Sequence, residues 1–394
     1  MKILGLYAED YPWDVRVFKI LGGLARDGHD VHLVCRNLKG SQGTETVDGI
    51  ICHRVGHPAW PKVMRSAWSV PAPFNPAWST IASRLAHDLS PDVILVRDVP
   101  LSPLALDVGR ATDTPVIVDM AENHPAMWRN VVARDRWKIP SLIMKNPSLV
   151  ERFEQRLIRE ADAVIVVIEE MRDRLIALGA EPERLSIVSN TPDLGDWPKA
   201  PSWFGRSGPL RVIFVGLINP MRGVGTVIEA LGLMGSDREV LFDVVGNGYN
   251  LDDLKSQALR GGVADRVVFH GWVDHDRLPD ILAGADLGII PHQVSEHTNT
   301  TIPNKIFDYM AASLPVIVSN ALPLKRIIQD HHCGFSFQGG NARNLADVLS
   351  ELPERSILEG MGENGRQAVE KHYHWSVDYD RLIRVIDRIV AVGN

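Results

Sequence analysis

Arg222 has a position along the chain that suits the binding of a phosphorylated ligand. It follows an apolar run, 210–215, and Gly216, and it precedes a helix-like segment, 224–231. A glycine at the end of a strand lets a ligand approach the backbone, and a helix N-terminus adds about half a positive charge and free N–H groups. Arg222 would add a full charge to this anion site. A plain turn with a solvated arginine explains the same residues equally well.

Lys305 and Asp308 form a second candidate pair for the same chemistry. They are three residues apart after Pro303, which can open a helix because its missing N–H would be unsatisfied there. On a helix they share one face, where the lysine could bind phosphate and the aspartate could bind ribose hydroxyls. The alternative is an ordinary surface ion pair, which contributes little to stability.

Polar side chains also follow strand-like segments in the first half. Asp14 lies between the apolar run 2–7 and the helix-like segment 15–26, and Arg16 lies near the start of that segment. Asp14 could either bind a ligand or cap that helix. Asp119 and Glu122 follow the apolar run 116–118, and His124 comes just after them. A single histidine is more often structural than catalytic.

Strands that alternate with amphipathic helices must position these residues. The pattern indicates parallel βαβ units. It breaks at 191–210, a stretch rich in proline and glycine, and then restarts. Two doubly wound units are the simplest explanation, with ligands bound beyond the carboxyl ends of the strands. The predicted strands are 2–7, 31–35, 93–96, 116–118, 163–167, 185–188, 210–215, 240–245, 266–269, 287–290, 316–319 and 334–337.

Composition narrows the possible classes of protein. A chain of 394 residues favours two domains, and the net charge of −7 argues against nucleic acid as the main partner. The three cysteines are scattered and show no metal-ligand spacing. The first residues lack a signal-peptide pattern, and no segment approaches the ~20 apolar residues of a membrane span. We therefore expect a cytoplasmic location.

Several segments together resemble the C-terminal half of the family 4 glycosyltransferases of the GT-B fold. They are the segments around Arg222 and Lys305, the Gly246-Asn247-Gly248 turn, and the stretches 269–273 and 285–291. The resemblance implies an α/β fold of two Rossmann-like, doubly wound domains with a cleft between them. We expect an acceptor-binding domain at 1–195, a donor-binding domain at 208–375, and a last helix at 376–394 that packs back on the first domain.

The resemblance also implies roles for residues of the second domain. Arg222 takes the place of a diphosphate-binding lysine with Lys305 beside it, and Asp308 takes the second acidic position of the Glu-x7-Glu motif, which contacts the donor ribose. Two positions depart from the family: Thr300 replaces the first glutamate, with Glu296 one turn earlier if that segment is helical, and Leu217 replaces a frequent arginine. The expected donor-binding residues are Gly216, Arg222, Gly223, Gly246, Gly248, Trp272, Val273, Thr300, Thr301, Asn304, Lys305, Ile306 and Asp308.

In the first domain, the loop with Asp14 and Arg16 resembles the family's acceptor loop. Many relatives carry Asp-x-His-Glu where this chain has Asp119 and Glu122, with Ala121 in the place of the histidine. The expected acceptor-binding residues are Asp14, Arg16, Asp119 and Glu122. The expected catalytic residues are Arg222, Lys305, Glu122 and His124.

Two basic segments rich in tryptophan, 51–87 and 128–145, suit contact with an anionic membrane surface. The alternative is a proline-rich loop whose tryptophans pack inward. Aromatic and basic residues together can also bind nucleic acid, but the overall acidity argues against it.

These observations predict a retaining glycosyltransferase of the hexosyltransferase type that works without a metal or cofactor. The expected donor is a nucleotide-diphosphate sugar, with UDP-sugar favoured, and the expected acceptor is a hydroxyl of a lipid-linked saccharide or polysaccharide. We expect the enzyme in the cytoplasm, with possible peripheral contact to the membrane. Two alternatives are a sugar-nucleotide epimerase of the GT-B fold and a non-catalytic glycosyltransferase-like subunit.

Overall fold

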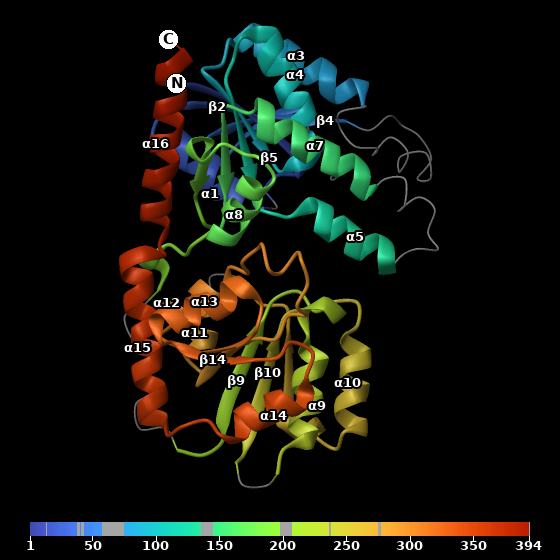
Figure 1. The fold of residues 1–394 in the computed structure, drawn as a ribbon, viewed down its shortest axis with the longest axis vertical. Helices are drawn as coiled ribbons and strands as arrows, with labels where there is room; N and C mark the ends of the chain where they lie inside the picture. Colours follow the sequence, from blue (N-terminus) through green and yellow to red (C-terminus); the bar gives the residue numbers. More distant parts are fainter. Residues whose placement is uncertain are drawn as a thin grey trace. The chain divides into compact units, whose positions relative to one another are not determined.

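The computed structural model describes residues 1–12, 14–37, 40, 43–56, 75–134, 145–197, 207–235, 238–274 and 277–393. The chain divides into two compact units (Figure 1). The first unit contains Met1–Val188 and Tyr379–Asn394, and the second contains Ser189–Asp378. The predicted boundary lay in the stretch 195–208, whereas the division falls just after the last strand of the first sheet.

A largely parallel sheet forms the centre of the first unit. Its order is β3-β4-β2-β1-β5-β6-β7-β8, and only the β3–β4 pair is antiparallel among the described strands. The strands predicted in this half are confirmed, with ends that shift by up to three residues. Two further strands that the sequence pattern did not predict, β3 and β4, extend one edge of the sheet. The bounds are β1 Lys2–Asp10, β2 Asp30–Arg36, β3 Thr44–Val47, β4 Ile50–Val55, β5 Val93–Arg97, β6 Val116–Met120, β7 Ala163–Val166 and β8 Leu185–Ile187.

Helices cover this sheet. Within the first unit, α3, α4 and α7 pack together, and α16 lies on the other side of the sheet (Figure 1). Asn75 and Asn146 cap α3 and α7, and a proline follows each cap, which is a strong local signal for a helix start. The bounds are α1 Val15–Arg26, α3 Pro76–Leu89, α4 Ser102–Thr112, α5 His124–Arg134, α7 Pro147–Glu160, α8 Glu169–Ala177 and α16 Trp375–Gly393.

From Tyr379 onward, the C-terminal helix α16 belongs to the first unit although it is the last element of the chain. The Tyr379 hydroxyl donates a hydrogen bond of 2.6 Å to Asp27, which lies just after α1. The Tyr379 ring also packs on Gly23 of α1, where a Cβ would come within 2.7 Å of the ring. Leu382 and Ile386 are fully buried. The sequence predicted the helix, and the fold supplies the surface that it covers.

The second unit has a parallel sheet of order β11-β10-β9-β12-β13-β14. Helices α9 and α10 lie on one side of this sheet, and α12, α13 and α15 lie on the other (Figure 1). The strand bounds are β9 Leu210–Val215, β10 Val240–Val245, β11 Val267–Gly271, β12 Leu287–Ile290, β13 Val316–Ser319 and β14 Gly334–Phe337. The helix bounds are α9 Val224–Leu233, α10 Leu251–Arg260, α11 Leu278–Leu282, α12 Lys305–Ala311, α13 Leu322–His331, α14 Ala342–Ser350 and α15 Arg355–His372.

The order of strands in the second unit reverses between β9 and β12. The chain runs from β9 outward to β10 and β11, and then returns to place β12 on the other side of β9. In open parallel sheets, ligands bind beyond the carboxyl ends of the strands at such a reversal. The loops after β9 and β12 are therefore the first place to search for a site.

Candidate functional site

Glycines shape the loops at this reversal point. Gly216 follows β9 with a φ of +136°, and a Cβ there would lie 2.7 Å from the Lys305 Nζ atom. A side chain at this position would displace the lysine. Gly216 therefore keeps space for the Lys305 ammonium group at the end of the strand.

Gly246 and Gly248 let two neighbouring loops approach each other closely. A Cβ on Gly246 would lie 2.0 Å from the Gly216 carbonyl oxygen, and one on Gly248 would lie 1.7 Å from the Ile218 carbonyl oxygen. The Ile218 N–H also donates to the Asn247 carbonyl at 2.8 Å. These glycines let the loops after β9 and β10 pack backbone against backbone. Their immediate role is to shape the loop that carries Arg222.

Gly223 fixes Arg222 against the loop that follows β12. The segment Pro220–Arg222 is a single 3₁₀ turn, and Gly223 follows it with a φ of +71° before α9 begins. A Cβ on Gly223 would lie 1.7 Å from the Pro291 carbonyl oxygen. The Gln293 N–H donates to the Met221 carbonyl at 2.9 Å. Arg222 is thus held where its Nη1 lies 3.4 Å from both ring nitrogens of His292.

Lys305 is the second cation at this point. It is the first residue of α12, and its Nζ atom lies 4.1 Å from the centre of the Phe214 ring, a cation–π contact. Burial lowers the pKa of Lys305 well below its usual range; the nearby Arg222 lowers it further, and Asp308 opposes the shift. The charge of Arg222 therefore disfavours the charged form of Lys305, and an anion bound near both side chains would offset that effect.

His292 completes the cluster, and it was not among the residues predicted from the sequence. Its side chain is buried, and burial, followed by the charges of Lys305 and Arg222, lowers its pKa well below the usual value. A neutral imidazole can still donate one hydrogen bond. The available signal was its position, because His292 follows β12 at the carboxyl end of the sheet.

The segment before α12 is not a regular helix, so the condition attached to Glu296 is not met. Residues 296–299 form turns, so Glu296 does not precede Thr300 on a regular helix. The hydroxyls of Thr300 and Thr301 donate to the carbonyls of Glu296 and His297, at 2.8 and 2.9 Å. Pro303 lies two residues before the first helical residue. These hydroxyls hold the turn together, a role that glutamate could not fill in the same way.

The remaining predicted donor residues differ in exposure. Asn304 is exposed at the start of α12, and its side chain makes no capping hydrogen bond there. Asp308 is half-buried on α12, whereas the Ile306 side chain is fully buried, so only its backbone could contact a ligand. After β11, Trp272 is exposed and Val273 is half-buried. Leu217 is exposed at the reversal point.

In the first unit, Arg16 and Asp119 form a buried ion pair. The Arg16 Nε donates to both Asp119 oxygens, at 2.9 and 2.8 Å, and Nη2 donates to one of them at 2.6 Å. Both side chains are at most 2% exposed. This pairing gives both residues a structural role, while the buried Arg16 Nη1 makes no hydrogen bond within the described residues. Their contact with an acceptor stays a prediction.

Asp14 joins the same network and also caps α1. One of its oxygens accepts hydrogen bonds from the N–H groups of Arg16 and Val17, which is the capping role considered from the sequence. Its other oxygen accepts a hydrogen bond of 3.2 Å from Arg97. Arg97 and Asp98, which directly follow the predicted strand 93–96, were missed although this position at a strand end was the available signal.

Glu122 and His124 lie beside Asp98. His124 is buried at the start of α5, and its Nδ1 lies 3.9 Å from an Asp98 oxygen and 3.3 Å from the Glu122 carbonyl oxygen. Burial raises the pKa of Asp98, while Arg97 and His124 lower it. The Glu122 side chain is half-buried. The first unit thus gathers four carboxylates, those of Asp14, Asp98, Asp119 and Glu122, around Arg97, with His124 beside Asp98.

Comparisons with known proteins match both units. The model of the "glycosyl transferase 4-like domain" matches residues 14–191, and the model of "glycosyl transferases group 1" matches residues 209–355. The chain belongs to the family 4 glycosyltransferases. Its structure has the GT-B fold of its structural neighbours, which confirms the predicted fold class.

Individual relatives of this glycosyltransferase agree with the assignment. The D-inositol 3-phosphate glycosyltransferase of Mycobacteroides abscessus is 28% identical over 334 residues, which cover 75% of this chain and 72% of the relative. Sucrose-phosphate synthase from Thermosynechococcus elongatus superposes with a TM-score of 0.76 over 99% of both chains, at 16% identity. Anabaena HepE in complex with UDP superposes with a TM-score of 0.73 over 98% of this chain and 100% of its own, at 15% identity.

The segments predicted to contact a membrane are partly described in this glycosyltransferase. Trp78 and Trp128 are buried, and the buried Arg54 side chain forms ion pairs with Asp10 and Glu45. The inward-packing alternative holds for these residues. The described helices include none that is long and apolar enough to span a bilayer. Among the other basic residues of these two segments, Arg84 is exposed, and Arg129 forms an ion pair with Glu151. The following aromatic, basic and apolar residues of the two segments lie outside the described ranges: Trp60, Lys62, Arg65, Trp68, Phe74, Arg136, Trp137, Lys138, Leu142, Ile143 and Met144.

Proposed function

We propose that this glycosyltransferase moves a sugar from a nucleotide-diphosphate sugar to an acceptor hydroxyl, with the donor bound by the second unit and the acceptor by the first. The observation that carries the proposal is the grouping of Arg222, His292 and Lys305 at the carboxyl ends of β9 and β12. Repelling cations held at a strand reversal form a site for a diphosphate. In this proposal Asp308, on the same short helix as Lys305, would accept hydrogen bonds from ribose hydroxyls.

The cations would act on the leaving group. Transfer breaks the bond between the anomeric carbon and the phosphate oxygen, and the electron pair of that bond goes to the departing diphosphate. A cation about 4 Å from such a charge gains about 4 kcal/mol at an effective dielectric constant near 20. Preorganised cations that oppose developing charge are commonly the largest catalytic contribution. In this proposal, Arg222 and Lys305 take the place of a divalent metal ion.

We further propose that the anomeric configuration is retained. The acceptor oxygen would attack from the face that the diphosphate leaves, and the leaving phosphate oxygen would take the proton of the acceptor hydroxyl. Glu122 and His124 would orient the acceptor on the first unit. Family membership supports retention, and a product of inverted configuration would contradict it.

UDP is the favoured nucleotide, and a lipid-linked saccharide or a polysaccharide is the favoured acceptor. The UDP bound to the structurally similar Anabaena HepE supports the choice of base. The basic and tryptophan-rich composition of 51–87 and 128–145 supports an acceptor presented at a membrane surface.

The deciding experiment measures nucleotide binding and sugar transfer by the same protein. Calorimetry with UDP, GDP and ADP should show binding of one nucleotide, and the matching nucleotide sugar should be consumed when acceptor is present and EDTA is added. Replacing Arg222 by alanine should lower turnover by about 10²–10³-fold, the effect of losing one preorganised donor to a developing anion. Arg260→Ala, an exposed arginine on α10, is the matched control. Turnover of Arg222→Ala near that of the control would contradict the proposal, as would nucleotide binding without any transfer.

A further inference from the structure

Each of the two donor-site cations lies against an aromatic ring. The Lys305 Nζ atom lies 4.1 Å from the centre of the Phe214 ring, and the Arg222 guanidinium contacts the imidazole ring of His292. Both rings are buried. They come from β9 and from the loop after β12, and because each is packed into the second unit, its position does not depend on the ligand.

The distances between Arg222 and His292 show that the guanidinium lies over the face of the ring. Its Nη1 atom is 3.4 Å from both Nδ1 and Nε2 of the imidazole. The Cε1 atom lies between these two nitrogens at the ring edge, so an atom in the ring plane at these equal distances would collide with it. A hydrogen bond in the plane would also bring Nη1 closer to one nitrogen. The contact is therefore a cation–π contact, as it is for Lys305 on Phe214.

The surroundings of His292 keep its ring suitable for this contact. Burial, followed by the charges of Lys305 and Arg222, lowers the pKa of His292 well below its usual value, so the ring is neutral near pH 7. A neutral ring attracts a cation to its face, whereas a protonated imidazole would repel Arg222. The ring adds no negative charge of its own, so it can hold the guanidinium without neutralising it.

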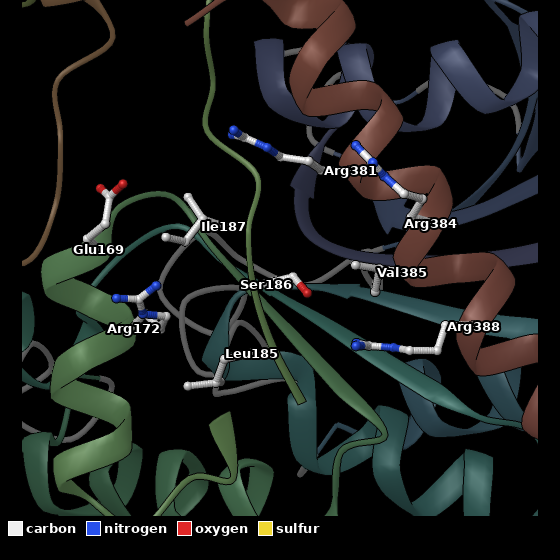
Figure 2. Close-up of a pocket in the computed structure, with 9 residues that line it drawn as sticks. All are labelled: Glu169, Arg172, Leu185, Ser186, Ile187, Arg381, Arg384, Val385 and Arg388. Carbon is white, nitrogen blue, oxygen red and sulfur yellow. The ribbon is translucent and has the colours of Figure 1, made fainter. Parts of the chain in front are cut away.

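Arginines elsewhere in the chain are held in other ways. Arg16 donates hydrogen bonds to the carboxylate of Asp119, which fixes the guanidinium but also neutralises it. Figure 2 shows the pocket between α8, β8 and α16, whose described lining contains four arginines and no aromatic side chain. One of them, Arg384, donates to the Asp380 carbonyl at 3.2 Å. Support by a buried ring is therefore not a general feature of arginines in this protein.

We propose that His292 is a positioning residue whose ring face holds the Arg222 guanidinium for the leaving diphosphate. This inference rests on the function proposed above, in which Arg222 stabilises the charge of the departing diphosphate. Gly223 fixes the backbone of Arg222, and the ring of His292 restricts the rotation of its long side chain. Less side-chain freedom then has to be lost when the donor binds and reacts.

Two replacements of His292 separate the ring face from the ring nitrogens. His292→Phe keeps a flat face without a nitrogen, whereas His292→Gln keeps a hydrogen-bonding nitrogen without a ring. With the nucleotide sugar that the wild type uses, turnover of His292→Phe should stay within about threefold of wild type, and that of His292→Gln should fall about tenfold or more, because a desolvated cation–π contact is lost. The control His331→Gln, a half-buried histidine at the end of α13, should keep full turnover.

Thermal unfolding separates this effect from a loss of stability. It gives the native fraction of each variant at the assay temperature, and turnover is expressed per native molecule. If His292→Gln is not native at that temperature, His292→Leu replaces it, because leucine fills the site without offering a ring face. Equal turnover of His292→Phe and His292→Gln would overturn the proposal. Higher turnover of His292→Gln would do the same, because hydrogen bonding would then matter more than the ring face.

NMR of the arginine side chains tests the contact without sugar transfer. Protons over the face of an aromatic ring resonate upfield, so the Arg222 guanidinium signal, assigned by its loss in Arg222→Lys, should be shifted upfield in the wild type and in His292→Phe but not in His292→Gln. An unshifted signal in the wild type would contradict the ring contact. A wild type that shows the shift but transfers no sugar from UDP-, GDP- or ADP-sugars would instead contradict the proposed function, on which the positioning role rests.

Discussion

The pKa of Lys305 depends on the groups that surround this residue in the fold. Burial and the charge of Arg222 lower its pKa, so the ligand-free protein holds this lysine partly or wholly neutral above that lowered value. A bound diphosphate favours the charged ammonium and raises the pKa again. The pKa is therefore lower in the free protein than in the complex.

Proton uptake on nucleotide binding follows from this difference. Between the lowered pKa of free Lys305 and its higher value in the complex, UDP binding should take up a proton, and affinity should decrease as pH rises through that interval. Calorimetry in buffers of different ionisation enthalpy measures the uptake. Lys305→Arg keeps the charge at every pH and should abolish most of the uptake. Equal proton uptake by wild type and Lys305→Arg would rule out Lys305 as its source.

Variants of the buried Arg16–Asp119 pair can show whether these two residues stabilise the fold or bind the acceptor. Asp119→Ala leaves the buried guanidinium of Arg16 without its partner and should lower the free energy of unfolding by about 3–5 kcal/mol. The double variant Arg16→Met/Asp119→Leu should recover part of that loss, because it removes both charges. Urea denaturation measures both variants.

Asp88→Ala, at an exposed site on α3, is the control for these variants and should change stability by less than about 0.5 kcal/mol. If Asp119→Ala instead keeps its stability and loses affinity for the acceptor, Asp119 is an acceptor ligand and the structural interpretation is wrong.

Between elements, the loop contacts after β9, β10 and β12 depend on glycine. Gly223→Ala would place a methyl group against the Pro291 carbonyl. It would also force alanine into the left-handed region of backbone angles, which by itself lowers the free energy of unfolding by about 1–2 kcal/mol. We expect lower stability together with weaker nucleotide binding, because the loop that carries Arg222 must move. Thermal unfolding and calorimetry measure the two effects.

Gly360→Ala tests whether any glycine replacement has this effect. Gly360 lies in α15 with open space around its Cβ position, so alanine should raise stability by up to about 1 kcal/mol and leave nucleotide affinity unchanged. Similar behaviour of the two variants would contradict the proposed role of Gly223.

At the scale of the whole molecule, the last helix completes the first unit rather than the second. Ile386→Ala creates a cavity beneath α16 and should destabilise the first unit by about 2–5 kcal/mol. Hydrogen exchange should become faster in the first unit, while the nucleotide affinity of the second unit stays the same. Asp387→Ala, exposed on the same helix, is the control. Faster exchange confined to the second unit would show that α16 stabilises a different part of the protein.

The sequence alone determined that strands and helices alternate in two successive units, and it identified the fold family. It also placed Arg222 after a strand and Lys305 at the start of a helix. Those features depend on local periodicity and on residues close together in the chain. Periodicity did not predict the hairpin of β3 and β4, because β3 is largely polar and exposed at a sheet edge.

The tertiary structure decided which of these residues meet. It brought His292 within 3.4 Å of Arg222, turned Arg16 onto Asp119 in the interior, and brought three arginines of the last helix to an edge strand about 200 residues earlier in the chain. Such contacts follow from the order of strands in a sheet and from the burial that packing imposes. Burial and neighbouring charge also set the pKa of Lys305, which no pattern along the chain can specify.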